Sequence, residues 1–276
     1  SDLHLLELID EEYAYFDRFD GRNPARGAQG VDVDTVVDAS SLLRFSECAI
    51  NALQDHHAIL GVSSASSYGL TPSYNDLWIE HRDDAYIITD VRDGSPAQAA
   101  GVKPGWRLVS VAGQPMAAAI SALCGGAYET DEAKGFAARV LAAGPRDQAR
   151  DFVFLDAEGD ERALSLPNLY QVEMPDRPLI SVSEHDDIRV LRFNNSLGEA
   201  GLIAAIDEAL SGPSPSGLVI DLRDTPSGGD TLYARALMGR LIDETRPYQR
   251  HAFPQIERDT GVARQWVEEV LPRGDS

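Results

Sequence analysis

The fold is decided by residues 217–241, which read GLVIDLRDTPSGGDTLYARALMGRL. The apolar run at 218–220 and 222 is too short for a helix and β-branched at its centre, so it predicts a buried strand. Turn-forming residues at 225–229 end that strand. Asp230 can then cap a helix, whose apolar residues recur at helical spacing: Leu232, Ala236, Leu237 and Leu241. The predicted unit is strand, glycine turn and helix.

The glycine turn is the candidate chemical feature of the chain. Backbone N–H groups at a helix N-terminus stabilise negative charge, which suits a phosphate, a carboxylate or the oxyanion of an acyl-transfer transition state. Gly228 and Gly229 are the candidate donors. The alternative is that both glycines only permit positive φ at a tight turn. No nucleotide-binding fingerprint accompanies the turn.

The stretch from Asp221 to Gly229 resembles the Asp-Leu-Arg-x-Asn-x-Gly-Gly element of the C-terminal processing (tail-specific) proteases, the serine peptidases of family S41. Thr225 stands where that family has Asn. Residues 53–57 are similar to a Leu-x-Asp-x-His element near the start of the same family. Adjacent histidines point to different sides of a helix, so we expect a helix end with a carboxylate holding an imidazole, and no metal site.

Composition limits the class of protein. The chain has 276 residues, 43% of them hydrophobic, and a net charge of -21. This charge disfavours nucleic acid and anionic membranes as partners, and no run is long enough to cross a bilayer. Cys48 and Cys124 give no disulfide framework; we expect two buried free thiols, with a single bridge as the alternative. The first residues predict a helix and no signal peptide, so we expect either a cytoplasmic protein or one whose leader has been removed. The compartment is undetermined, and the family resemblance favours a periplasmic or other extracytoplasmic location.

Residues 1–72 predict an N-terminal helical region. Apolar residues at 6, 9, 13 and 16 indicate one amphipathic helix, and a second is expected over about 34–54. Residues 73–168 predict a β-rich domain with strands around an Asp83-Asp84 turn, a short helix capped by Ser95, a longer helix over about 130–143 and a final hairpin at 158–160.

The second region resembles a PDZ domain of the bacterial protease type. The match is carried by Ser95-Pro96-Ala97, Ala100-Gly101-Val102, Pro104-Gly105 and Val111-Ala112-Gly113, while Trp106 replaces the usual Asp. The resemblance implies that a peptide C-terminus adds as a strand beside a helix. Its carboxylate would then meet a peptide-binding segment formed by Asn75, Asp76, Leu77 and Trp78. The alternative is a β-rich domain whose groove is closed.

Residues 169–276 predict a partial peptidase core. A connector leads into a strand over 188–193, a helix begins at a capping box of Ser196 and Glu199, and the glycine-turn unit follows. This order predicts a parallel βαβ arrangement. A last short helix is expected at 265–270. The predicted fold class is α/β and α+β multidomain: a helical layer, a PDZ-like domain and part of a ClpP/crotonase-like core.

The resemblance implies a serine-type peptidase that captures substrate C-termini, with a Ser–Lys dyad located well after the glycine turn. The chain has only Lys103 and Lys134, so no lysine follows the turn and the dyad cannot be built from these residues. We therefore expect a truncated peptidase that binds a polypeptide but does not cleave it, without cofactor or metal. The alternative is a non-catalytic protein on the same core that binds a peptide or an apolar ligand.

Overall fold

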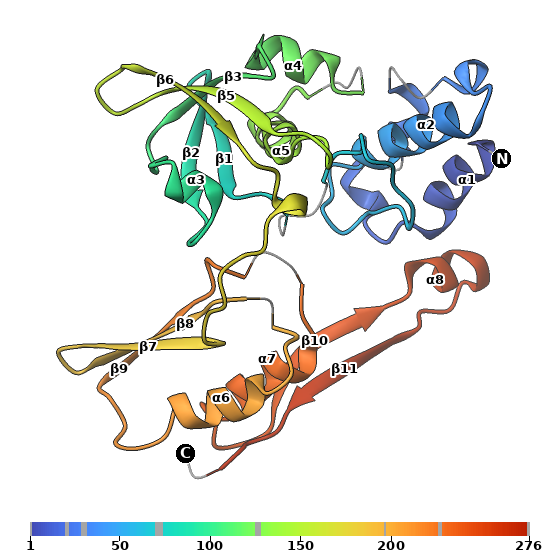
Figure 1. Cartoon of the computed structure of the whole chain (residues 1–276). Helices are drawn as coiled ribbons and strands as arrows, with labels where there is room; N and C mark the ends of the chain where they lie inside the picture. Colours follow the sequence, from blue (N-terminus) through green and yellow to red (C-terminus); the bar gives the residue numbers. More distant parts are fainter. Residues whose placement is uncertain are drawn as a thin grey trace. The chain divides into compact units, whose positions relative to one another are not determined.

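A computed structural model of the whole chain describes residues 2–19, 22–28, 32–69, 74–124, 128–195, 197–225 and 228–274. The chain forms a mixed α/β protein of two compact units, Ser1–Pro175 and Asp176–Ser276 (Figure 1). The first unit contains both the helical region and the sheet of residues 77–166, each with its own hydrophobic cluster. The predicted three-part division of the chain remains a prediction.

The helical region is built on α1 (Asp2–Glu12) and α2 (Ala39–Asn51), joined by the short 3₁₀ helices η1 (Phe16–Phe19), η2 (Pro24–Gly27) and η3 (Val33–Thr35). α2 begins later than predicted because Asp38 and Ser41 form a reciprocal capping box. α1 ends at Glu12, so Tyr13 and Phe16, which were predicted to lie on this helix, follow it. The hydrophobic cluster of this region contains the following buried residues: Leu6, Ile9, Ala25, Phe45, Ala49, Ile50 and Leu53.

The expectation of two free thiols is wrong, because Cys48 and Cys124 are joined in a disulfide with their Cα atoms 5.1 Å apart. The bridge links α2 of the helical region to Cys124 of the sheet region, two residues after the end of α4 (Met116–Ala122). It spans 76 positions in the sequence. Sequence spacing does not reveal such a pair, since the two residues meet only through tertiary packing.

The sheet of the first unit runs in the order β1-β2-β3-β5-β6, with β4 paired to β3. Its strands are antiparallel. Their bounds are Leu77–Arg82 (β1), Ala85–Val91 (β2), Arg107–Val111 (β3), Gln114–Pro115 (β4), Arg150–Leu155 (β5) and Glu161–Leu166 (β6). Asp83 and Asp84 both have positive φ, as the predicted turn between β1 and β2 requires.

Three helices accompany this sheet: α3 (Pro96–Ala99), α4 (Met116–Ala122) and α5 (Asp131–Ala143). Ser95 caps α3 and Thr130 caps α5, both through side-chain acceptance of a backbone N–H, which confirms the predicted helix starts. α4 was not predicted, because its alanine-rich sequence has little amphipathic pattern. α5 packs along β1 and contributes nine buried residues to the core.

The second unit contains the predicted parallel pair. β8 (Ile188–Phe193) lies between antiparallel β7 (Ile180–His185) and parallel β9 (Gly217–Asp221). α6 (Leu202–Ala209) connects β8 to β9, and α7 (Thr231–Met238) follows the glycine turn. Ser196 of the predicted capping box lies outside the described residues, and α6 begins only at Leu202, after Gly201. The cluster of this unit is made by Leu191, Phe193, Leu202, Ile206 and Leu237.

The predicted helix at 265–270 is wrong, because these residues form β11 (Gln265–Val270), paired antiparallel with β10 (Arg246–Ala252). α8 (Pro254–Thr260) joins the two strands. Trp266 stacks on His251 of β10 with ring centroids 4.6 Å apart, a cross-strand contact that the local sequence does not show.

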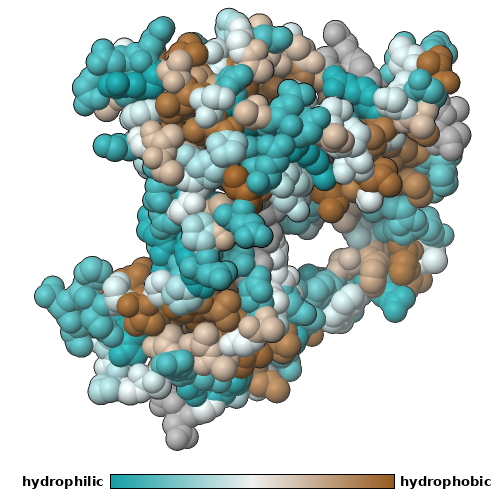
Figure 2. All heavy atoms as spheres, viewed as in Figure 1, coloured by the Kyte–Doolittle hydropathy of each residue, from teal (hydrophilic) through white to brown (hydrophobic). Residues whose placement is uncertain are grey.

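Apolar side chains are also found at the surface of the second unit. Val182, Ile188 and Val219 on β7, β8 and β9 are between 43% and 48% exposed. Figure 2 shows hydrophobic residues gathered in this part of the molecule. Among the described residues, no helix is both long and apolar enough to cross a membrane.

Candidate functional site

The glycine turn begins where β9 ends, at Asp221. The Asp221 carboxylate accepts hydrogen bonds from the backbone N–H and the guanidinium of Arg223, with Oδ1–N at 3.1 Å and Oδ2–Nη2 at 2.7 Å. These bonds lower the pKa of Asp221 to about 2. The pair therefore fixes the direction of the chain as it leaves the strand.

Asp224 anchors the turn through contacts with two arginines that precede it in the sequence. Its carboxylate is buried and accepts a hydrogen bond from Arg177, whose other terminal nitrogen donates to the Asn194 carbonyl at 2.7 Å. Arg192 lies 3.5 Å from the same carboxylate. Sequence analysis missed this anchor, because its two arginines precede the turn by more than thirty residues.

Both glycines of the turn are exposed, whereas Pro226 and Ser227 lie outside the described residues. A methyl group on Gly229 would lie 2.5 Å from the carbonyl carbon of Leu197, so only glycine fits against that segment. The Leu197 carbonyl accepts the Asp230 N–H at 2.9 Å. Asp230 caps α7 as predicted, its Oδ1 accepting the Leu232 N–H at 2.7 Å. The turn is thus packed on one side and open on the other.

The predicted peptide-binding segment lies at the start of β1, where its groups have partners within the chain. The Asn75 side chain donates to the Arg139 carbonyl at 2.8 Å and accepts the Leu77 N–H at 3.0 Å. Asp76 is buried and forms a bidentate pair with Arg150. The Leu77 side chain belongs to the core, and Trp78 is 40% exposed.

The edge of β1 is covered by α5. The Arg139 guanidinium donates from Nη1 to the Ile79 carbonyl at 2.8 Å and lies over the Trp78 ring, 4.4 Å from its centroid. Burial lowers the pKa of Arg139. Gly135 of the same helix brings α5 close to β1, since a methyl group there would be 3.4 Å from the Ile79 oxygen. A peptide strand adding to β1 would have to displace Arg139.

The predicted carboxylate–imidazole contact is confirmed at Asp55. Its Oδ1 accepts the His57 backbone N–H and contacts Nδ1 of the same residue, each at 2.9 Å. The Tyr13 hydroxyl donates to Oδ2 at 2.7 Å. Burial opposes ionisation of Asp55, but these bonds outweigh it and lower its pKa. His56 points elsewhere, with its ring 4.8 Å from that of Phe136. Within the described ranges, no group of three metal-ligating side chains occurs.

Other candidate nucleophiles and bases are scattered. Lys103 is exposed and Lys134 half-buried, both in the first unit. His185 has Ser183 at 3.4 Å on the same face of β7, and both are exposed. His251 lies 3.5 Å from Glu268 and is stacked on Trp266. Neither histidine lies in the glycine turn.

Fold and site together define a mixed α/β protein of more than one unit, with a capped glycine turn between a parallel strand and a helix. No family model matches the chain, and no curated protein matches it either. Its structural neighbours are S41-type peptidases. The photosystem II D1 C-terminal processing protease is 14% identical, with 98% of this chain and 69% of that chain covered and a TM-score of 0.49.

Two further solved structures are similar. Mature CPAF is 15% identical over 91% of this chain and 60% of its own, with a TM-score of 0.49. A protein of Bacteroides fragilis assigned to the S41 proteases is 14% identical over 97% and 66%, with a TM-score of 0.34. The chain therefore spans only part of each of these proteins.

Proposed function

We propose that this chain forms part of a C-terminal processing serine peptidase, contributing the substrate-capturing domain and the glycine turn of the peptidase core. The observation that carries the proposal is the turn after β9. Its sequence matches the S41 element, and its two glycines are exposed at the capped start of α7. Backbone donors at that place suit the oxyanion of a peptide-bond hydrolysis transition state.

The residues of this chain do not themselves supply a Ser–Lys pair. The two lysines belong to the first unit and precede the glycine turn by about ninety residues or more in the sequence. A serine hydroxyl needs a base that removes its proton. We therefore expect these 276 residues to bind a polypeptide without hydrolysing it.

Peptide capture is assigned to β1. It is the edge strand of its sheet and α5 packs against it, so an added strand would have to displace the close contact at Gly135 as well as Arg139. The Ile79 carbonyl, now bound by Arg139, is a natural acceptor for the incoming backbone. Binding would thus exchange the Arg139 contact for strand hydrogen bonds.

Two measurements on the purified chain test the proposal. Fluorescein-labelled unstructured peptides with a free C-terminus are expected to raise fluorescence anisotropy, while the same peptides with a C-terminal amide bind more weakly. Mass spectrometry of the peptides after prolonged incubation should show no cleavage. Turnover that a serine-directed acylating reagent abolishes would contradict the inactivity, and equal binding of acid and amide would contradict C-terminal capture.

A second candidate function is non-catalytic binding of a peptide or an apolar ligand on the same core. The exposed valines and isoleucine of β7–β9 favour it, because such side chains form apolar surface that a ligand can bury. Titration with a fluorescent apolar probe separates the candidates. The second candidate is supported if the apolar probe binds saturably and peptides do not compete with it, while the chain binds no peptide C-terminus.

A further inference from the structure

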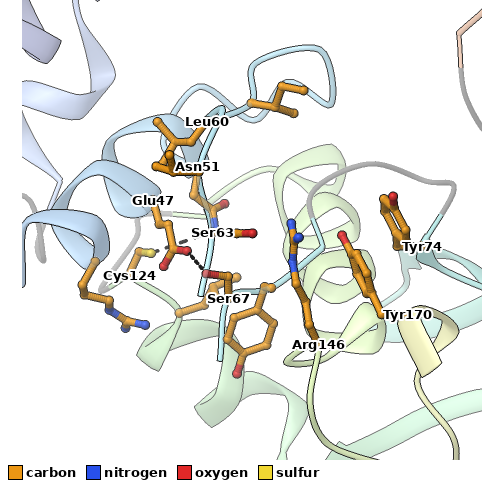
Figure 3. Close-up of a pocket in the computed structure, with 14 residues that line it drawn as sticks. Glu47, Asn51, Leu60, Ser63, Ser67, Tyr74, Cys124, Arg146 and Tyr170 are labelled. Carbon is orange, nitrogen blue, oxygen red and sulfur yellow. Dashed lines mark hydrogen bonds between the residues drawn. The ribbon is translucent and has the colours of Figure 1, made fainter. Parts of the chain in front are cut away.

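A cavity of about 240 Å³ lies in the first unit, and its lining includes no residue of β1. It is formed by α2, by the segment 59–68, by the disulfide half Cys124, and by Arg146 and Tyr170 (Figure 3). It is large enough for a ligand of amino-acid size and smaller than a drug-sized site.

Arg146 gives the cavity a fixed cation. Its guanidinium lies over the Tyr170 ring at 4.4 Å from the centroid, and Tyr170 stacks on Tyr74 with centroids 3.7 Å apart and planes 6° from parallel. Figure 3 shows the three side chains side by side. The stack holds the planar donor group in one orientation, which lowers the entropy lost when an anion binds.

The same guanidinium has donors left for a ligand. Within the described ranges the Arg146 guanidinium makes no hydrogen bond or ion pair, although its Nε is buried. Donor groups of a guanidinium that have no partner are satisfied when a ligand supplies an acceptor. A planar carboxylate matches the two-pronged geometry of this donor.

The charge around the cavity is positive in a chain that is strongly acidic overall. Arg44 of α2 also lines it and is exposed, whereas the one lining carboxylate, Glu47, accepts the Ser67 hydroxyl. The full chain has a net charge of -21, which repels anions in general, so positively charged places such as this cavity are the favoured sites for an anion.

The remaining wall is apolar. Ile59, Leu60, Val62 and Leu123 line it, and Ile59 and Val62 are largely exposed, at 59% and 69%. Apolar side chains next to a fixed arginine define an amphipathic site, in which a hydrophobic group is buried while its charge is paired.

We infer that this cavity binds a small monocarboxylate carrying a compact apolar group, with Arg146 holding the carboxylate and the 59–62 segment covering the apolar part. The shared chemistry fits a free carboxylic acid or the terminal residue of a peptide. The site does not depend on the peptidase proposal, since it uses neither β1 nor the glycines.

Isothermal titration calorimetry with the whole chain tests the inference without any variant. The probes are 3-phenylpropionate, its neutral isostere 3-phenylpropanol, inorganic phosphate, and the tripeptide acetyl-Gly-Gly-Phe as acid and as amide. The acid is expected to bind at least tenfold more tightly than the alcohol and than phosphate. Peptide acid binding without free acid binding assigns the site to chain termini; binding of neither acid, or equal binding of acid and alcohol, overturns the inference.

Arg146→Gln is expected to weaken binding of the acid by roughly tenfold to a hundredfold while leaving the alcohol unchanged. Arg107→Gln is the matched control, because Arg107 is an exposed arginine of β3 in the same unit and does not line the cavity. Unchanged binding in Arg146→Gln, or an equal loss in the control, overturns the assignment. A proton NMR spectrum of each variant checks the fold.

Discussion

Arg150 forms a buried bidentate ion pair with Asp76, with Nη1–Oδ1 at 2.6 Å and Nη2–Oδ2 at 3.1 Å. The second carboxylate oxygen also accepts the Ala97 N–H at the start of α3, at 3.0 Å. Arg150 donates further to the Pro167 carbonyl. One ion pair therefore ties together β1, α3, β5 and the segment after β6.

We expect Asp76→Asn to lower the free energy of unfolding by about 3–5 kcal/mol, because it leaves the Arg150 charge buried without its partner. Urea unfolding followed by circular dichroism measures the change. The control is Arg162→Met, which removes the half-exposed partner of Asp156 on the next strand and should cost much less. Equal losses of unfolding free energy in the two variants would show that the buried Asp76–Arg150 pair contributes no more to stability than the Asp156–Arg162 pair.

Gly229→Ala is expected to destabilise the second unit by about 1–3 kcal/mol, because the added methyl group collides with the Leu197 backbone. Gly228→Ala is the matched control, since a methyl group there meets no atom within 4 Å. Thermal unfolding of both variants measures the difference. If Gly229→Ala and Gly228→Ala change the melting temperature equally, Gly229 does not pack against the Leu197 backbone and the packing described for the turn is incorrect.

Local signals in the sequence were sufficient where a side chain acts on its own neighbours. Ser95 and Asp230 cap the helices for which they were proposed, because an N-cap acts within three residues, and Thr130 caps the helix predicted to begin near it. Hydrophobic alternation likewise located β1, β2 and the parallel pair β8–β9. Residues 265–270 were misread as a helix because their strand is defined by its distant partner β10.

The parts of the candidate site that depend on distant contacts were not predictable. Asp76 was proposed as a ligand contact, yet its carboxylate is committed to Arg150, 74 positions away. The Arg177–Asp224 anchor and the tyrosine stack under Arg146 also join segments far apart in the sequence. No periodicity or spacing encodes such pairs.

Replacing both cysteines by serine is expected to lower the free energy of unfolding by about 2–5 kcal/mol, since the bridge spans 76 positions and constrains the unfolded chain. Adding reductant to the unaltered protein should have a similar effect on the melting temperature. Thiol titration under denaturing, non-reducing conditions gives the direct control. Two reactive thiols per freshly purified chain would show that the bridge is not formed.

The Asp221 carboxyl has a pKa of about 2, below its ordinary value of 3.8, because Arg223 hydrogen-bonds its charged form. A lowered folded-state pKa stabilises the protein above the unfolded value, and this stabilisation is lost as the pH falls from about 4 to about 2. Carbon-13 NMR titration of the carboxyl group should show the low pKa. In Arg223→Gln it should move back toward 3.8; an unchanged value would mean that Arg223 is not its cause.

Arg139→Ala is expected to strengthen binding of a C-terminal peptide at β1, because it frees the Ile79 carbonyl that an added strand would use. The variant also loses the contact with Trp78, so some loss of stability should accompany the gain in affinity. Fluorescence anisotropy with a labelled peptide measures the dissociation constant, and urea unfolding measures stability. Arg107→Ala, which removes an exposed arginine of β3, controls for the loss of a positive charge. Weaker or unchanged peptide binding in Arg139→Ala, with the control unaffected, would show that β1 does not accept a strand and that α5 closes this edge permanently.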